Sequence, residues 1–277
     1  MIETPRFETL ADLRVEIDRI DAALHEFLIK RGEIIHRLIE AKARQGGGLA
    51  FRPAREADMM RALIARHHGL LPLDTVEGIW RIIISTFTFV QSSYSVHADI
   101  SGGDAAMRDC CRFHFGFTVP YVPQADAAGV VEAVAASHGD LGLVRVASQQ
   151  KPWWRALSDP AAPKVIARLP FVERPDHPAG LPVFVIAKPL AEAAVRDIVL
   201  YDVSTSGDDV SLGPQLEILG RSPLKEEVSL LVAAKPDAAE AWQTAIAAAG
   251  AGTPRIVEIG GHAARCDASE LQRDAAQ

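Results

Sequence analysis

Apolar side chains recur every three or four residues near the start of the chain, in the stretch LRVEIDRIDAALHEFLIKRGEIIHRLIEAK, residues 13–42. This spacing is typical of a helix that buries one face, and we expect one helix over residues 8–45, closed by the glycines at 46–48. At about 1.5 Å per residue this helix is roughly 55 Å long, more than a monomeric three-helix unit can cover. The pattern therefore predicts a partner for the helix.

Two more helices are expected in the first third of the chain, over residues 54–68 after Pro53 and from Leu73 to about Val96. From about His97 the pattern changes to short apolar runs typical of strands that alternate with helices. A proline-rich passage over Pro152–Pro182 interrupts these runs, and the tail is expected to hold a helix over Ala238–Ala249. The expected strands are Thr118–Val122, Leu141–Val146, Val183–Ala187, Arg196–Val203, Val228–Ala233 and Arg255–Ile259.

Composition argues against several classes of function. A net charge of -7 over 277 residues, without a basic run, argues against a nucleic-acid partner. The longest apolar stretch, Ile79–Val90, contains Arg81 and is shorter than the ~20 residues that a membrane span needs. The N-terminus lacks the order of a signal peptide, so we expect a cytoplasmic protein. Three cysteines, two of them the neighbours Cys110 and Cys111, form neither a disulfide framework nor a metal-ligand spacing.

Cations interrupt the apolar face of the first helix. Arg31 and Lys42 are eleven residues apart, which is three turns plus about 20°, so they share a face and lie ~16 Å apart along the axis. Two long side chains at this spacing could hold one small molecule between them. Arg14 lies ~25 Å from Arg31 and could join them only from a second, antiparallel copy of the chain. The alternative is that Arg31 extends its guanidinium out of the apolar face and the other two cations are solvated.

The motifs LRVEIDRIDAAL, FLIKRGEI, EAK, READMM and IIISTFTFVQ follow one another over residues 8–95. In residue types and spacing this segment resembles the all-helical chorismate mutases, including those fused to prephenate dehydratase. The resemblance implies a three-helix unit that forms an intertwined homodimer and rearranges chorismate to prephenate. It implies neither a cofactor nor a metal, because this Claisen rearrangement needs only a held reactive conformer and stabilised charge.

The resemblance also implies a set of site residues. Arg14 and Arg31 would bind the two carboxylates of chorismate, because a guanidinium presents a planar fork to each. Lys42 and Gln91 would donate to the ether oxygen, which gains negative charge as its bond to carbon lengthens. Glu56 would accept from the ring hydroxyl. One subunit would supply Arg14, and the other Arg31, Lys42, Arg55, Glu56 and Gln91.

Two residues depart from the family pattern at the site. Arg52 stands where the family usually has an aspartate, and Phe87 where it commonly has a small residue that helps to hold a carboxylate. We expect Arg52, Arg55 and Phe87 to contact the substrate and to change how its ring carboxylate is held. Arg55 could equally be an ion-pair partner within its helix.

The stretches ISGGDAAMRDCCRFHFG and AAGVVEAVAASHGDLGLVRV resemble the opening lobe of a prephenate dehydratase, which has a periplasmic-binding-protein-like α/β fold. The second lobe is shrunk to the residues between Ala147 and Gly180. Where that family has Thr-Arg-Phe, this chain has Pro182, Val183 and Phe184. Proline offers neither a hydroxyl nor an N–H, and valine cannot bind a carboxylate. We therefore predict that dehydratase activity is absent.

The sequence thus predicts a multidomain α and α/β protein in three parts. These are a helical chorismate mutase domain (1–96), a truncated dehydratase-like α/β domain (97–190) and a small α+β, ACT-like tail (191–277). Two other functions stay open: a bifunctional mutase and dehydratase, and a non-catalytic sensor of a shikimate-pathway acid, for which Arg52 and Phe87 would be the evidence. A related helical fold also cleaves isochorismate.

Overall fold

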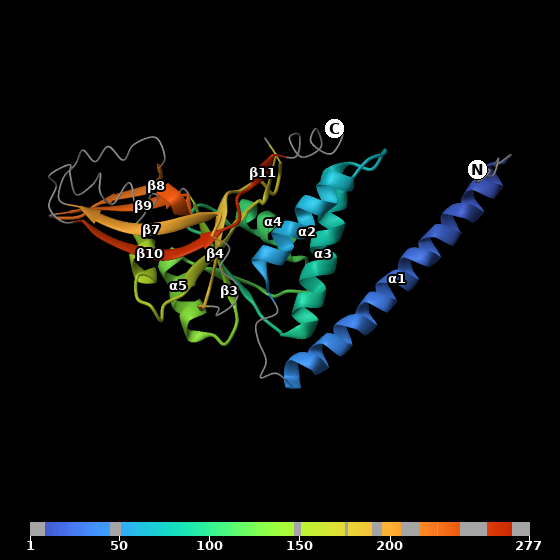
Figure 1. The fold of residues 1–277 in the computed structure, drawn as a ribbon, viewed down its shortest axis with the longest axis horizontal. Helices are drawn as coiled ribbons and strands as arrows, with labels where there is room; N and C mark the ends of the chain where they lie inside the picture. Colours follow the sequence, from blue (N-terminus) through green and yellow to red (C-terminus); the bar gives the residue numbers. More distant parts are fainter. Residues whose placement is uncertain are drawn as a thin grey trace. The chain divides into compact units, whose positions relative to one another are not determined.

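The computed structural model of the protein describes residues 9–44, 51–146, 151–174, 177–189, 196–205, 216–225, 227–238 and 254–267. Contacts divide the chain into two compact units, Met1–Gly48 and Leu49–Gln277. Helix α1 (Leu10–Arg44) forms the described part of the first unit and confirms the predicted long helix (Figure 1). Thr9 and Asp12 cap its start, because the Asp12 backbone N–H donates to Thr9 Oγ1 and the Thr9 backbone N–H donates to Asp12, each at 3.2 Å.

The second unit begins with two helices, α2 (Pro53–Arg66) and α3 (Leu73–Gln91). Pro53 stands in the first turn of α2, where a missing N–H costs no helical hydrogen bond. The prediction that the third helix continues to about Val96 is wrong. Ser92 adopts an extended conformation after α3, and Val96 is the first residue of a buried strand. The buried faces of α2 and α3 pack together with Phe171, from the α/β part of the unit.

A mixed nine-stranded sheet forms the centre of the second unit (Figure 1), in the order β2-β1-β3-β6-β4-β10-β7-β9-β8. Its pairs β1/β2, β1/β3 and β4/β10 are parallel, and the others are antiparallel. A parallel pair, β5 (Val172–Glu173) with β11 (Cys266–Asp267), forms a second sheet. The nine strands are β1 (Val96–Asp99), β2 (Tyr121–Gln124), β3 (Leu141–Arg145), β4 (Lys164–Leu169), β6 (Val183–Ala187), β7 (Ile198–Thr205), β8 (Leu216–Pro223), β9 (Val228–Ala234) and β10 (Arg255–His262).

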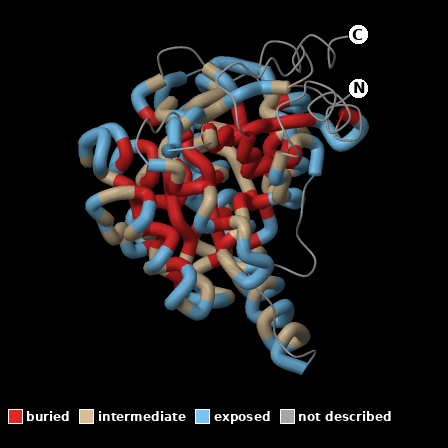
Figure 2. The backbone as a smooth tube through the Cα atoms, turned by 90° about the vertical axis from the view of Figure 1, so that its left-hand side faces the viewer, coloured by how far each residue is buried: buried red, intermediate tan, exposed pale blue. Residues whose placement is uncertain are grey.

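Both faces of the sheet are covered, as the alternation along β6 shows. Val183 and Val185 pack in one cluster with α4 (Asp104–Phe115), while Phe184 and Ile186 pack in another with α5 (Ala127–Ala136) and the 3-10 turn η1 (Trp153–Leu157). Successive side chains of a strand point to opposite faces, so a strand that is buried throughout must have a layer on each side. Figure 2 shows this buried interior as a continuous band within the unit.

All six predicted strands are present, and β6 has the predicted bounds. Five described strands, β1, β4, β5, β8 and β11, are not among the six predicted ranges. Strand β4 lies inside the proline-rich passage, between Pro163 and Pro170, which limit it to six residues. The predicted helix Ala238–Ala249 lies outside the described residues beyond Ala238, where a short 3-10 turn, η2 (Pro236–Ala238), ends.

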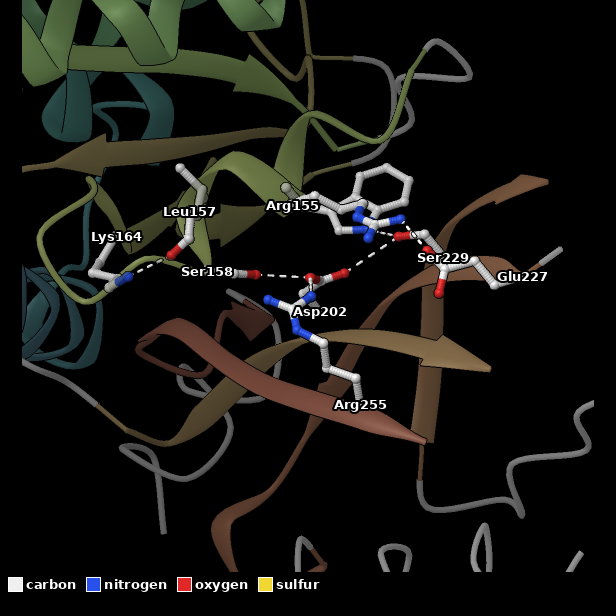
Figure 3. A network of polar contacts seen from close by, with 9 residues as sticks. Arg155, Leu157, Ser158, Lys164, Asp202, Glu227, Ser229 and Arg255 are labelled. Atoms are coloured by element: carbon white, nitrogen blue, oxygen red, sulfur yellow. Dashed lines mark hydrogen bonds and ion pairs between the residues drawn. The ribbon is translucent and has the colours of Figure 1, made fainter. Parts of the chain in front are cut away.

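A buried carboxylate fastens η1 to the sheet (Figure 3). Asp202 of β7 has no exposed surface and accepts hydrogen bonds from Ser158 at 2.7 Å, Arg255 at 2.9 Å and Ser229 at 3.3 Å. The indole N–H of Trp154 donates to the Ser229 hydroxyl at 2.8 Å. A buried charge is tolerated when it is paired and hydrogen-bonded, so this network can hold η1 against the large sheet.

Strand β10 joins β4 through a glycine that no other residue can replace without strain. Gly260 has a φ of +133°, and a Cβ there would lie 2.1 Å from the Val165 carbonyl oxygen of β4. The register of β10 against β7 also shifts between Glu258 and Gly260. Strands β4 and β10 therefore pair at a position where only glycine fits without strain.

We expect Gly260→Ala to destabilise the second unit by about 3 kcal/mol or more, because it adds a backbone clash to an unfavourable φ. Gly103→Ala is the matched control, since Gly103 has a φ of +103° but its added Cβ would meet nothing within 4 Å. Its expected cost is about 1 kcal/mol. Urea unfolding followed by tryptophan fluorescence measures both, and equal losses would contradict the proposed close approach.

Candidate active site

Three predicted site residues, Arg14, Arg31 and Lys42, lie on the single uninterrupted helix α1. Because the helix is continuous, Arg31 and Lys42 share a face ~16 Å apart, and Arg14 lies ~25 Å from Arg31 toward the N-terminus. Arg31 and Lys42 are half-buried and Arg14 is exposed. The first unit thus brings together two of its three candidate cations.

Helix α1 exposes its apolar residues in the single chain. None of its residues is buried, and apolar residues along it are widely exposed, for example Leu38 at 38% and Leu10 at 74%. Soluble proteins rarely leave an apolar stripe of this length in water, since burial of each such side chain is worth roughly 1.5–3 kcal/mol. The need of this helix for a partner stays a prediction.

The other five predicted site residues lie in the second unit. Arg52 precedes the first turn of α2, which holds Arg55 and Glu56, while Phe87 and Gln91 lie at the end of α3. The Gln91 amide donates to the Phe87 carbonyl at 3.0 Å. Arg52 and Arg55 are exposed and the remaining three are half-buried. Assembly of these five residues with the cations of α1 into one site stays a prediction.

Glu56 has a partner that the sequence analysis did not foresee. Its Oε2 accepts from Arg81 of α3 at 3.2 Å, and the side chains of Glu56 and Arg81 are 14% and 5% exposed. Burial raises the pKa of Glu56 to about 7, and the nearby positive charge of Arg81 opposes this only in part. Glu56 is therefore a carboxyl group that titrates near neutral pH.

The ion pair continues through the interior of the second unit. Glu77, also on α3, has its Oε1 3.7 Å from the Arg81 Nε. Its Oε2 accepts a hydrogen bond at 2.5 Å from Arg174, the residue that follows β5. Glu77 is 1% exposed. The ion pair between Glu77 and Arg81 could have been predicted from the sequence, because the two residues are one helical turn apart and interrupt an apolar helix face. From the sequence, Arg81 counted only as evidence against a membrane span.

A small hollow lies beside the Glu56–Arg81 pair. Tyr94 and His114 line it, and neither the Tyr94 hydroxyl nor the His114 ring nitrogens have hydrogen-bond partners among the described residues. Burial and the charge of Arg81 lower the pKa of His114, so its ring is neutral. The surroundings of Glu56 are thus poorly solvated, which explains the raised pKa of its carboxyl group.

Pro182 immediately precedes β6, and Val183 and Phe184 are its first two residues. Val183 and Phe184 belong to β6 and have no exposed surface, and the Pro182 carbonyl accepts from the Val146 backbone N–H at 3.0 Å. Their side chains offer no group for acid–base chemistry or anion binding. Within the described ranges, no cluster of three His, Cys, Asp or Glu side chains could hold a metal, and no helix is long and apolar enough to cross a membrane.

Comparison with known proteins assigns the helical segment. The family model for chorismate mutase type II matches residues 13–92. The bifunctional chorismate mutase/prephenate dehydratase of Aquifex aeolicus is 27% identical over 143 residues, which are 50% of this chain and 39% of that protein. No solved structure matches. The chain therefore has an N-terminal chorismate mutase type II domain followed by a mixed α/β region with a large sheet.

Protonation of Glu56 gives a test of the buried pair. Because its pKa is raised in the folded protein, Glu56 contributes stability that is fully present below about pH 4.5 and is lost as the pH rises through about 7. We expect Glu56→Gln to raise the free energy of unfolding at pH 8 by about 2 kcal/mol relative to wild type, with little gain near pH 4.5. The exposed Glu132→Gln is the control, and pH-dependent urea unfolding measures both. A gain of the same size at both pH values would contradict the raised pKa.

Proposed function

We propose that this protein is a chorismate mutase that rearranges chorismate to prephenate. The observation that supports this most directly is the family match over residues 13–92, which contains all eight predicted site residues in order. The spacing of Arg31 and Lys42 on one face of α1 adds to it, since two cations ~16 Å apart suit a small dicarboxylate held between them.

The chemistry that we propose needs positioning and charge, and no nucleophile. Arg31 holds one carboxylate of chorismate in a folded conformer, while Lys42 and Gln91 donate to the ether oxygen as its bond to carbon lengthens. Preorganised donors act on the transition state more than on the ground state, and losing one typically costs roughly 3 kcal/mol, or 10² to 10³ in rate. We expect Lys42→Met to lose activity on this scale.

Glu56 would accept from the ring hydroxyl of chorismate. Arg81 contacts its Oε2, and its Oε1 makes no hydrogen bond to any described residue. Arg81 would therefore fix the carboxylate and leave one oxygen for the substrate. Arg52, Arg55 and Phe87 would lie around the ring carboxylate, with Arg52 and Arg55 adding positive charge.

We propose that the active form is a homodimer in which α1 packs antiparallel to its copy. This would cover the exposed apolar stripe of α1 and bring Arg14 of the partner subunit to the second carboxylate, which Arg14 of the same helix cannot reach across ~25 Å. An antiparallel twofold pair creates two equivalent sites, each built from both chains.

We propose that the α/β region lacks dehydratase activity and serves the mutase as a stabilising or regulatory part. Pro182 and Val183 supply no group for loss of water and carbon dioxide. A truncated periplasmic-binding-protein-like domain over 97–190, an ACT-like tail over 191–277 and a cytoplasmic location complete the proposal. The experiment that tests the function is chorismate turnover, followed by ultraviolet absorbance at neutral pH. We expect first-order loss of chorismate at saturating enzyme, and an unchanged absorbance would exclude the mutase.

Mixing inactive variants tests the shared site. Arg14→Ala and Arg31→Ala should each be inactive alone. After co-refolding, half of the dimers are mixed and one of their two sites keeps both arginines, so about one quarter of the wild-type activity should return. Lys42→Ala mixed with Arg31→Ala is the control. Both of these residues come from the same chain in our proposal, so no activity should return. Restoration in the control, or none in the test pair, would argue against Arg14 acting across the interface.

Gln91 predicts a pH dependence. An amide N–H donates a hydrogen bond at any pH in this range, so wild-type activity should be broad through neutral pH. A carboxyl group donates only when it is protonated, so Gln91→Glu should be active only under acid conditions. Gln124→Glu, on β2 and outside the proposed site, should keep the wild-type profile. Equal activity of Gln91→Glu at pH 5 and pH 8 would remove Gln91 from the mechanism.

A further inference from the structure

Arg174 belongs to the α/β part of the second unit and contacts a buried carboxylate of α3. It directly follows β5, and its Nη2 donates to Glu77 Oε2 at 2.5 Å. The side chain of Arg174 is 19% exposed, whereas that of Glu77 is 1% exposed. Arg174 therefore brings a positive charge from the α/β part to a carboxylate that water does not reach.

Glu77 and Glu56 share a second cation, Arg81. The Arg81 Nη1 donates to Glu56 Oε2 at 3.2 Å, and the Arg81 Nε lies 3.7 Å from Glu77 Oε1. The shorter distance is within the usual range of a hydrogen bond and the longer one is outside it. The side chain of Arg81 is 5% exposed, so solvent screens neither contact well. Arg81 thus favours Glu56 in a place where small changes in charge have large effects.

Arg174 maintains this preference by neutralising Glu77. Among the described residues, Arg81 is the other cation within ion-pair distance of Glu77, so it would be drawn there if Arg174 were absent. The Arg81 Nε–H and Glu77 Oε1 are both buried without a hydrogen-bond partner in the part of the chain that the structure describes. A small turn of the guanidinium would join these two atoms and weaken its contact with Glu56.

Glu56 has no second cation close by to replace Arg81. The other polar groups around its carboxyl group are the Tyr94 hydroxyl, the neutral His114 ring and, on the side of β4, Arg168. None of these three forms a hydrogen bond or ion pair with the Glu56 side chain among the described contacts. Burial already raises the pKa of Glu56 to about 7, and the charge of Arg81 opposes this rise. Without that contact, the carboxyl group would be less ionised and less fixed in position.

We propose that Arg174 is a positioning residue for the mutase, which acts on Glu56 without touching the substrate. Its pairing with Glu77 leaves Arg81 to hold Glu56 Oε2, so that Oε1 stays available to the ring hydroxyl of chorismate. This inference rests on the proposed function of the helical domain. It gives the α/β part a definite task, since a residue after β5 sets the geometry of a substrate-binding carboxylate on α2.

Steady-state kinetics of the full chain with chorismate at pH 8 test the proposal. We expect Arg174→Met to lower kcat/KM about 10-fold, because the ring hydroxyl then meets a weaker acceptor. Arg174→Lys should stay within about 3-fold of wild type, since its ammonium group still neutralises Glu77. Arg196→Met, which removes an exposed cation paired with Glu258, is the matched control and should leave kcat/KM unchanged. An unchanged kcat/KM in Arg174→Met would overturn the proposal.

Double variants separate positioning from a general loss of stability. Adding Glu77→Gln to Arg174→Met removes the carboxylate that competes for Arg81, so kcat/KM should return to within about 3-fold of wild type. In a Glu56→Gln background, Arg174→Met should change kcat/KM by less than about 2-fold, because the group on which it acts is already neutral. If Arg174 only supported the fold, its removal would cost the same factor in all three backgrounds, and that result would contradict the proposal.

Urea unfolding at pH 8 tests the same coupling without substrate. If Arg81 turns away from Glu56 in Arg174→Met, the buried carboxylate is less compensated. Glu56→Gln should then raise the urea midpoint more in this background than in wild type. An equal rise in both backgrounds would overturn the coupling. A larger rise in a protein that does not turn over chorismate would support the coupling and contradict the proposed function, so the two failures are distinguishable.

Discussion

A chain of buried charges, Glu56–Arg81–Glu77–Arg174, holds α2 and α3 against the α/β part of the second unit. Glu77 is the member with two cation partners, Arg81 and Arg174, and removing such a shared counter-charge typically costs about 3–5 kcal/mol because the buried cations are left without it. The consequence is that most of α2 and α3 is committed to the large sheet and its neighbours. Contacts accordingly divide the chain between Gly48 and Leu49, within the segment that matches the chorismate mutase family.

This division explains why α1 and the rest of the chain have different needs. Helices α2 and α3 bury their apolar faces within their own unit, whereas α1 leaves its stripe exposed. A second copy of α1 would bury that stripe and complete the cation set in the same step, so stability and catalysis would depend on one interface. The α/β region would then act on the mutase through α2 and α3, which carry Glu56 and Gln91. The burial that this packing produces is what raises the pKa of Glu56.

Sequence periodicity predicted the elements whose burial is regular and missed those whose burial depends on distant partners. The long helix followed from apolar residues spaced every three or four positions, and β6 followed from a continuous apolar run. The end of α3 was placed too late, because the apolar residues that follow Ser92 continue directly into β1 and periodicity alone does not separate a helix from an adjoining buried strand. The contact between Arg81 and Glu56 was missed because the resemblance assigned Glu56 only a contact with the substrate. The structure shows that Glu56 also contacts a side chain of its own protein. The Asp202 network was likewise not predicted, since its three partners, Ser158, Ser229 and Arg255, come from three separate segments.

Our central proposal is that the helical domain performs the rearrangement and that the α/β region, which carries Pro182 before β6 and Val183 in it, does not process the product. The most direct measurement is proton NMR of chorismate with the full chain at neutral pH, recorded without acid treatment. Our account predicts that prephenate accumulates in proportion to the chorismate consumed. Formation of phenylpyruvate at a comparable enzyme-dependent rate, or chorismate that persists unchanged, would contradict it.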